Sequence, residues 1–165
     1  GLVLTLVGNP NRSLSAFIPD SFSPWVHVPP AEMLSRRQVA LDAIALIPSG
    51  ASVSADTPLL PLLAQREAVI RFPKHVRYRD RDGAVQEVDW VVAFPGYYEP
   101  LAPVFKRERK QQRSIREELG ELTASGRYRL VHCSGGAVVL QRQVSGSTPI
   151  QRPTAGTASA CSWLG

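Results

Sequence analysis

Five polar and aromatic residues lie where a strand is expected to end and a helix to begin. They are Ser54, Asp56 and Thr57 after a short strand, and Tyr97 and Tyr98 after the most strand-like segment of the chain. Open α/β sheets bind ligands at such strand ends, because free backbone N–H groups point outward there. Tyrosine rings can also stack on a sugar or another ring. We therefore predict a small-molecule or sugar site here; an ordinary helix cap and loop is the alternative.

The same region argues against a nucleotide or phosphate ligand. A carboxylate at Asp56 would repel an anion, and the sequence contains neither a GxGxxG nor a Walker pattern. No serine lies in a nucleophile elbow. Cys133 and Cys161 form no CxxC pair, and the three histidines are scattered along the chain. We expect no catalytic residue, no metal site and no cofactor.

A basic cluster defines a second candidate site, on a helix expected over residues 101–123. Its cations precede Glu117, Glu118 and Glu121, and this order opposes the helix dipole at a cost of about 0.3–1 kcal/mol for each charge. Contact with anionic lipid headgroups would explain it; a solvated helix face is the alternative. The cations of this cluster are Lys106, Arg107, Arg109, Lys110 and Arg113.

Hydrophobic periodicity and turn residues place these candidates in a succession of helices and strands. Ser35 and Gln38 fit a capping box that starts the first helix. The apolar run 88–94 indicates a central strand buried on both faces, and Asp82-Gly83 indicates an exposed hairpin. Further elements are expected as strands at 51–55 and 68–72, helices at 58–65 and 101–123, and a terminal hairpin of 128–133 with 137–142. Residues at three- and four-residue steps in the helix at 101–123, among them Ile115, Leu119 and Leu122, predict an apolar stripe that faces the sheet.

This order of elements predicts an α/β fold. We expect a mixed β-sheet of about five to six strands, helices packed on its faces, and a terminal antiparallel hairpin. The first two strands are expected to be parallel, because a short helix joins them. A length of 165 residues and a hydrophobic fraction of 44% suit one domain. We assign this domain to residues 35–143, followed by a flexible tail at 144–165.

Residues 1–34 are expected to form an apolar stump and a proline-rich linker. The uncharged run 1–7 is shorter than the roughly 20 residues that cross a bilayer, so it is either a short strand or the end of a transmembrane helix. Prolines over residues 8–34 disfavour helix and central strand. Aromatic residues of this stretch either pack on the domain or lie at a membrane interface; they are Phe17, Phe22 and Trp25.

Four segments in a fixed order resemble the predicted membrane proteins of the domain-of-unknown-function 2079 family. They read AIALIPSGASVSA at 43–55, LPLLAQR at 60–66, IRFP at 70–73 and DWVV at 89–92, and the resemblance extends over residues 34–142. The resemblance implies a non-catalytic, extracytoplasmic soluble domain of a polytopic cell-membrane protein. It further implies a link to membrane glycosyltransferases that use a lipid-linked sugar.

The partners that follow from the resemblance are the membrane part of the same polypeptide and lipid headgroups or a glycan acceptor. A net charge of +5 suits anionic partners. Nucleic acid is not expected, because Tyr78 alone interleaves with the arginines around it. The alternative function is a small-molecule or sugar-binding α/β domain with its site at the strand ends near Asp56 and Tyr97.

Overall fold

A computed structural model describes residues 29–143; the predicted stump, the tail and most of the linker lie outside the described residues. One mixed sheet carries the fold. β1 (Val53–Ala55) is parallel to β2 (Val69–Arg71) and β5 (Trp90–Ala93), and β7 (Ala137–Arg142) is antiparallel to β5 and β6 (Tyr128–Ser134). This arrangement confirms the mixed α/β sheet, the first parallel pair and the terminal antiparallel hairpin. In spatial order the five strands are β2, β1, β5, β7 and β6.

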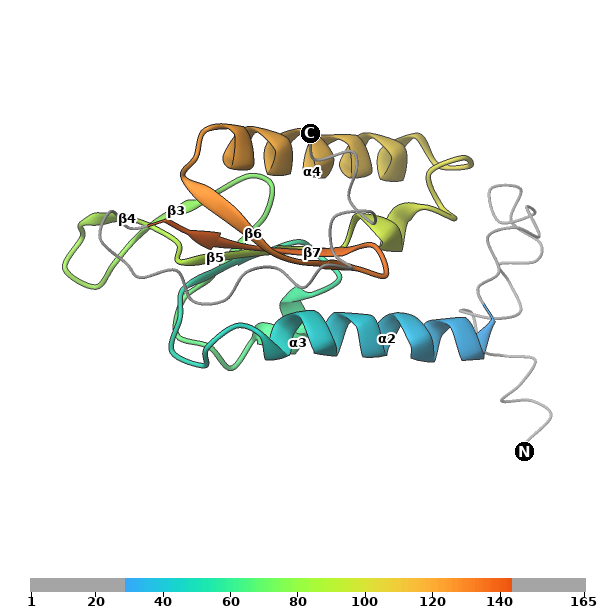
Figure 1. Cartoon of the computed structure of the whole chain (residues 1–165), viewed down its shortest axis with the longest axis horizontal. Coiled ribbons are helices and arrows are strands. Elements are labelled where there is room, and N and C mark those ends of the chain that lie inside the picture. The colour runs from blue at the N-terminus through green and yellow to red at the C-terminus, as the bar shows by residue number, and fades with distance from the viewer. Residues whose placement is uncertain (1–28, 144–165) are drawn as a thin grey trace, which may run out of the picture.

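Helices cover both faces of the sheet (Figure 1). The long helix α4 (Lys106–Ala124) lies on one face, and α2 (Pro30–Ala45) with the four-residue α3 (Leu60–Leu63) lies on the other. A 3-10 helix, η3 (Pro95–Tyr98), follows β5 and leads toward α4. The sheet is therefore the middle layer of three, and each of its faces has its own core.

The central strand β5 supplies side chains to both cores. All four of its residues are buried, which confirms the prediction of a central strand. Val91 packs in the core beneath α4, and Val92 packs in the core beneath α2 and α3, because successive side chains of a strand point to opposite faces. The predicted apolar stripe of the long helix is confirmed by its buried members Ile115, Leu119 and Leu122.

The start predicted for the first helix was wrong. Helix α2 begins at Pro30, so Ser35 lies inside it and forms no cap. Proline suits a first helical position, since its φ angle is already helical and its missing N–H would have no partner there. The backbone N–H of Met33 then donates to the carbonyl of Pro29 at 3.0 Å. The side chain of Gln38 donates forward to Asp42 at 2.7 Å instead of reaching back to a cap.

The start predicted for the long helix was also wrong. Residues 101–104 form turns, Phe105 is extended, and α4 begins at Lys106. Pro103 explains the delay, because proline disfavours the helical conformation of the residue before it and lacks an N–H donor. The guanidinium of Arg109 closes these turns by donating to the carbonyls of Ala102 and Pro103, both at 2.9 Å. The basic cluster therefore occupies the first turns of the helix.

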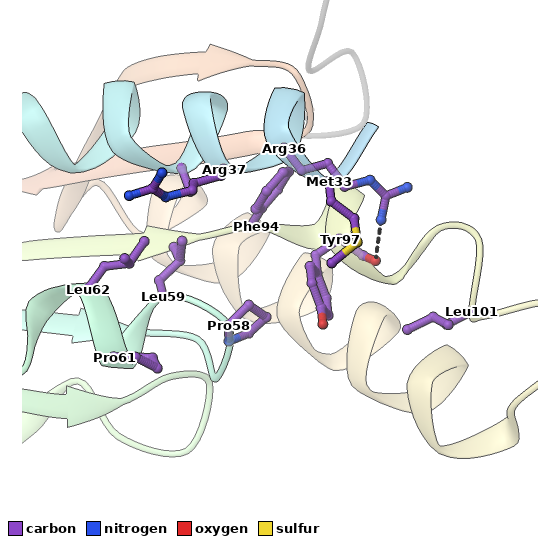
Figure 2. A pocket seen from close by; sticks show the side chains of 11 residues that line it. Met33, Arg36, Arg37, Pro58, Leu59, Pro61, Leu62, Phe94, Tyr97 and Leu101 are labelled. Carbon is purple, nitrogen blue, oxygen red and sulfur yellow. Dashed lines mark hydrogen bonds between the residues drawn. The ribbon is translucent and has the colours of Figure 1, made fainter. Parts of the chain in front are cut away.

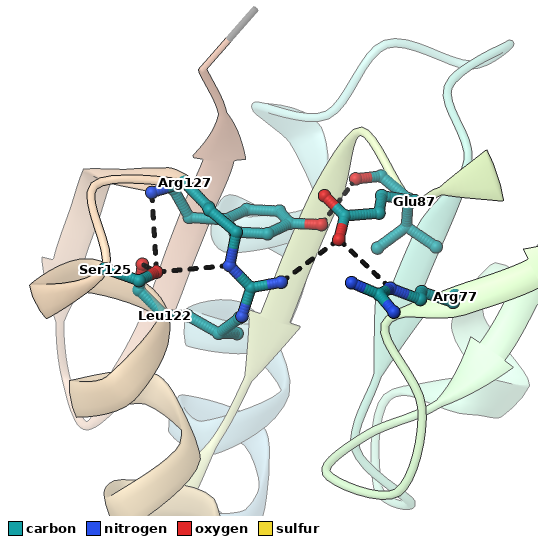
Figure 3. Close-up of polar contacts among 7 residues, drawn as sticks. Arg77, Glu87, Leu122, Ser125 and Arg127 are labelled. Atoms are coloured by element: carbon teal, nitrogen blue, oxygen red, sulfur yellow. Dashed lines mark hydrogen bonds and ion pairs between the residues drawn. The ribbon is translucent and has the colours of Figure 1, made fainter.

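The predicted exposed hairpin forms a separate two-stranded sheet, β3 (Arg77–Arg79) and β4 (Val85–Glu87). One carboxylate ties this hairpin to the body of the domain (Figure 3). Oε1 of Glu87 accepts from Nε of Arg77 at 3.2 Å and from Nη1 of Arg127 at 3.0 Å. Since Arg127 immediately precedes β6, its ion pair with Glu87 joins the hairpin to the edge of the main sheet.

Candidate functional site

Three parallel strands end at one edge of the sheet, and Asp56 links two of these ends. Its backbone N–H donates to the carbonyl of Val92 at 3.2 Å, and its Oδ2 accepts the backbone N–H of Phe94 at 3.0 Å. The carbonyl of Asp56 also accepts from the N–H of Leu59 at 3.0 Å. Asp56 thus holds the end of β1 against the end of β5 and starts the turn toward α3.

Asp56 and Ser54 lie beneath the surface of this edge, with no exposed area. Burial raises the pKa of Asp56 from its ordinary 3.8 to about 7, although the hydrogen bond from Phe94 acts in the opposite direction. Oδ1 of Asp56 has no hydrogen-bond partner within residues 29–143. The Ser54 hydroxyl donates to the carbonyl of His75 at 2.6 Å. Direct ligand contact by these two residues stays a prediction.

Thr57, Tyr97 and Tyr98, the other three predicted residues, line a pocket of about 420 Å³ that lies at the same edge. The rings of Tyr97 and Tyr98 meet edge to face, with centroids 5.3 Å apart and planes at 82°. Tyr98 is only 6% exposed, and burial first and the nearby Asp56 second raise its pKa. We call this the strand-end pocket; its remaining lining residues are Pro58, Arg71, Leu101, Arg107, Glu108 and Gln111.

Sequence reasoning missed Arg71 and Gln111 as members of this site. Arg71 is the last residue of β2, and the parallel pairing of β2 with β1 brings it to the edge where Asp56 lies. That signal was present in the sequence, because the strand at 68–72 was predicted to be parallel to its neighbour. Gln111 lies one turn into α4, and only the packing of that helix beside η3 brings it to the pocket.

The predicted cations all lie in the first half of α4 and are exposed. Arg107 lines the strand-end pocket. Arg109 is engaged by the two backbone carbonyls that close the turns before the helix. Arg107 and Arg109 therefore each have contacts or neighbours that the sequence did not show. The predicted contact of the five cations with an anionic surface stays a prediction. The other three are Lys106, Lys110 and Arg113.

An apolar groove of about 350 Å³ adjoins the strand-end pocket, and side chains from α2, α3 and η3 converge on it (Figure 2). Several of its apolar residues are well exposed, with Met33 61%, Leu62 43% and Tyr97 39% accessible. One guanidinium nitrogen of Arg36 donates to the carbonyl of Tyr97 at 3.4 Å across the groove end. The two hollows share Pro58, Tyr97 and Leu101.

The fold and these hollows define an α/β domain with a ligand-sized pocket at the carboxyl ends of parallel strands. The model of the family described as "Predicted membrane protein (DUF2079)" matches residues 1–139, so the chain belongs to this family of predicted membrane proteins, and the resemblance is confirmed. No curated protein and no solved structure matches the chain.

In the part of the chain that the structure describes, no helix is long and apolar enough to cross a membrane. Within the same residues, no group of three or more histidine, cysteine or acidic side chains is arranged to hold a metal ion. The polar side chains that line the strand-end pocket are two arginines, one glutamate, one glutamine, one threonine and two tyrosines.

Proposed function

We propose that this chain is a non-catalytic, extracytoplasmic domain of a polytopic cell-membrane protein. Membership in a family of predicted membrane proteins supports the membrane setting. The observation that supports the extracytoplasmic side is at Cys133, a residue of β6 that is disulfide-bonded. Disulfides persist in oxidising compartments and are rare where thioredoxin and glutathione keep thiols reduced. The sequence has one other cysteine, Cys161, which lies outside the described residues.

A cysteine placed on the exposed hairpin tests the side of the membrane. In intact cells that express the full-length protein, we expect Asp82→Cys to react with a membrane-impermeant maleimide, because Asp82 is exposed. Ala93→Cys is the matched control and should not react, since that position is 0% exposed. Labelling of Asp82→Cys only after the cells are permeabilised would place the domain in the cytoplasm.

The proposed partners are the membrane part of the same polypeptide and either lipid headgroups or a glycan acceptor. Apolar side chains at the start of α2 support a contact of this kind, since Met33 is 61% and Leu34 is 65% exposed, and exposed apolar patches often mark such contacts. The role of the whole protein as a glycosyltransferase that uses a lipid-linked sugar rests on the resemblance alone and stays a prediction.

The strand-end pocket supports a second function, the binding of a small hydroxylated molecule such as a sugar. Its volume of about 420 Å³ lies in the range of ligand pockets. Tyr97 offers an exposed ring to stack on a sugar, and the edge-to-face contact with Tyr98 holds that ring in place. Such binding would let the domain recognise an acceptor without carrying out chemistry itself.

Saturation-transfer NMR with methyl α-glucoside tests this binding. We expect transfer from the 165-residue chain to the sugar protons, and a loss of most of that transfer in Tyr97→Ala, because the stacking ring is removed. Leu62→Ala is the control, since Leu62 lines the groove but not the strand-end pocket. Equal transfer in all three proteins would show that the sugar does not bind at Tyr97.

A further inference from the structure

We propose that the ligand of the strand-end pocket carries a phosphate group, which binds between Arg71 and Arg107. This inference rests on the proposed ligand-binding function and adds the chemical class of the ligand. It follows from the charges around the pocket, from the buried amide nitrogen of Gln111, which has no hydrogen-bond partner in the described part of the chain, and from the way in which α4 begins.

The pocket presents two arginines that come from different elements. Arg71 ends β2, and Arg107 lies in the first turn of α4; both are exposed. Neither forms an ion pair with an acid of residues 29–143. Glu108 lines the same pocket, so the two arginines and one glutamate leave one net positive charge. Arginine is suited to phosphate, because its planar guanidinium donates two parallel hydrogen bonds to neighbouring oxygens.

A further side chain of the pocket, Gln111, has a buried polar atom that lacks a hydrogen-bond partner in the described part of the chain. Nε2 of Gln111 is buried and donates to no acceptor. Unpaired polar groups at buried positions are costly, and a bound ligand would satisfy them. A phosphate offers three strong acceptor oxygens, more than the two of a carboxylate.

Helix α4 starts in a way that favours an anion beside it. No side chain caps its N-terminus, because the N-cap residue is Phe105. Backbone N–H groups of a first helical turn have no partner within the helix, and the cations clustered there oppose the dipole. An anion next to this turn would accept hydrogen bonds from these N–H groups and would balance the charge of the cations. Such an anion would explain a charge order that is otherwise unfavourable for the helix.

The carboxyl group of Asp56 does not prevent this binding. Asp56 is 0% exposed and lies behind the pocket rather than lining it. Burial raises its pKa to about 7, so a large fraction of the group is uncharged near neutral pH. The volume of about 420 Å³ leaves room for a sugar-sized group next to the phosphate.

Calorimetric titration of the 165-residue chain with glucose 1-phosphate, inorganic phosphate and methyl α-glucoside tests the inference. We expect glucose 1-phosphate to bind more tightly than methyl α-glucoside. Arg71→Ala and Arg107→Ala should each weaken its binding about tenfold or more, because each removes a charge-assisted contact. Arg37→Ala is the matched control; Arg37 is an exposed arginine of the groove that does not line the pocket, and its loss should leave the affinity within about twofold.

Vesicles of phosphatidylcholine with phosphatidic acid form a further arm, which tests whether the phosphate belongs to a lipid headgroup. Vesicle binding that Arg71→Ala and Arg107→Ala abolish, without binding of glucose 1-phosphate, would support the phosphate site and identify a lipid as its source. Equal affinity for glucose 1-phosphate and methyl α-glucoside would overturn the phosphate inference and leave the sugar site intact. Failure of all four probes to bind, or an equal loss in Arg37→Ala, would overturn it together with the pocket.

Discussion

Asp56→Asn is expected to make the domain more stable than the unsubstituted chain at pH 8, and the difference should disappear near pH 4. Burial raises the pKa of Asp56 from 3.8 to about 7, so between these values the folded chain holds a proton that the unfolded chain has released. The contribution of the neutral carboxyl group to stability is therefore complete below about pH 4 and is lost as pH rises toward 7. Its full size is at most about 4 kcal/mol.

Urea unfolding at a series of pH values measures this effect. Asparagine does not titrate, and its side-chain oxygen can still accept the N–H of Phe94. The free energy of unfolding of Asp56→Asn should therefore not show the fall between about pH 4 and pH 7 that the titration of Asp56 causes in the unsubstituted chain. Ser54→Ala is the control, because it removes a buried hydroxyl of the same strand that does not titrate. Its effect should be similar at pH 4 and pH 8. Parallel pH profiles for Asp56→Asn and the unsubstituted chain would contradict the raised pKa.

Gly136→Ala is expected to lower the free energy of unfolding by about 2–5 kcal/mol. Gly136 lies in the turn between β6 and β7 with a φ of +83°, where an L side chain costs roughly 1–2 kcal/mol. A Cβ atom there would also lie 2.8 Å from the Cα of Gly96. This contact is too short, and relieving it would require the backbone itself to shift. Overpacking of this kind costs about a further 1–3 kcal/mol.

A second glycine separates these two costs. Gly83, in the turn of the exposed hairpin, has a similar φ of +81°, but a Cβ there would meet nothing within 4 Å. Urea unfolding of Gly83→Ala should therefore show the conformational cost alone. Equal losses in the two variants would mean that the backbones of Gly96 and Gly136 do not pack as closely as described. Because Gly96 directly precedes Tyr97, Gly136→Ala should also reduce ligand binding at the strand-end pocket.

Most of the fold could be predicted because its signals are local. The apolar run around Val91 and Val92 indicated a strand buried on both faces, and the stripe of Ile115, Leu119 and Leu122 indicated a helix packed on a sheet; both are confirmed. Both wrong helix starts involve prolines: Pro30 was expected to disfavour a helix, and Pro103 was expected to lie inside one. Pro30 starts a helix and Pro103 delays one, since the effect of a proline depends on its position relative to the helix end.

The sequence by itself determined the succession of helices and strands and the pairing of the first strands. Periodicity and turn residues carry this information, because they act between near neighbours along the chain. Tertiary structure alone decided which side chains reach the pocket. Asp56 lies beneath the strand ends because its carboxylate accepts the N–H of Phe94, 38 residues further along. Gln111 lines the same pocket as Tyr98 only because α4 packs beside η3, and no local pattern specifies this packing.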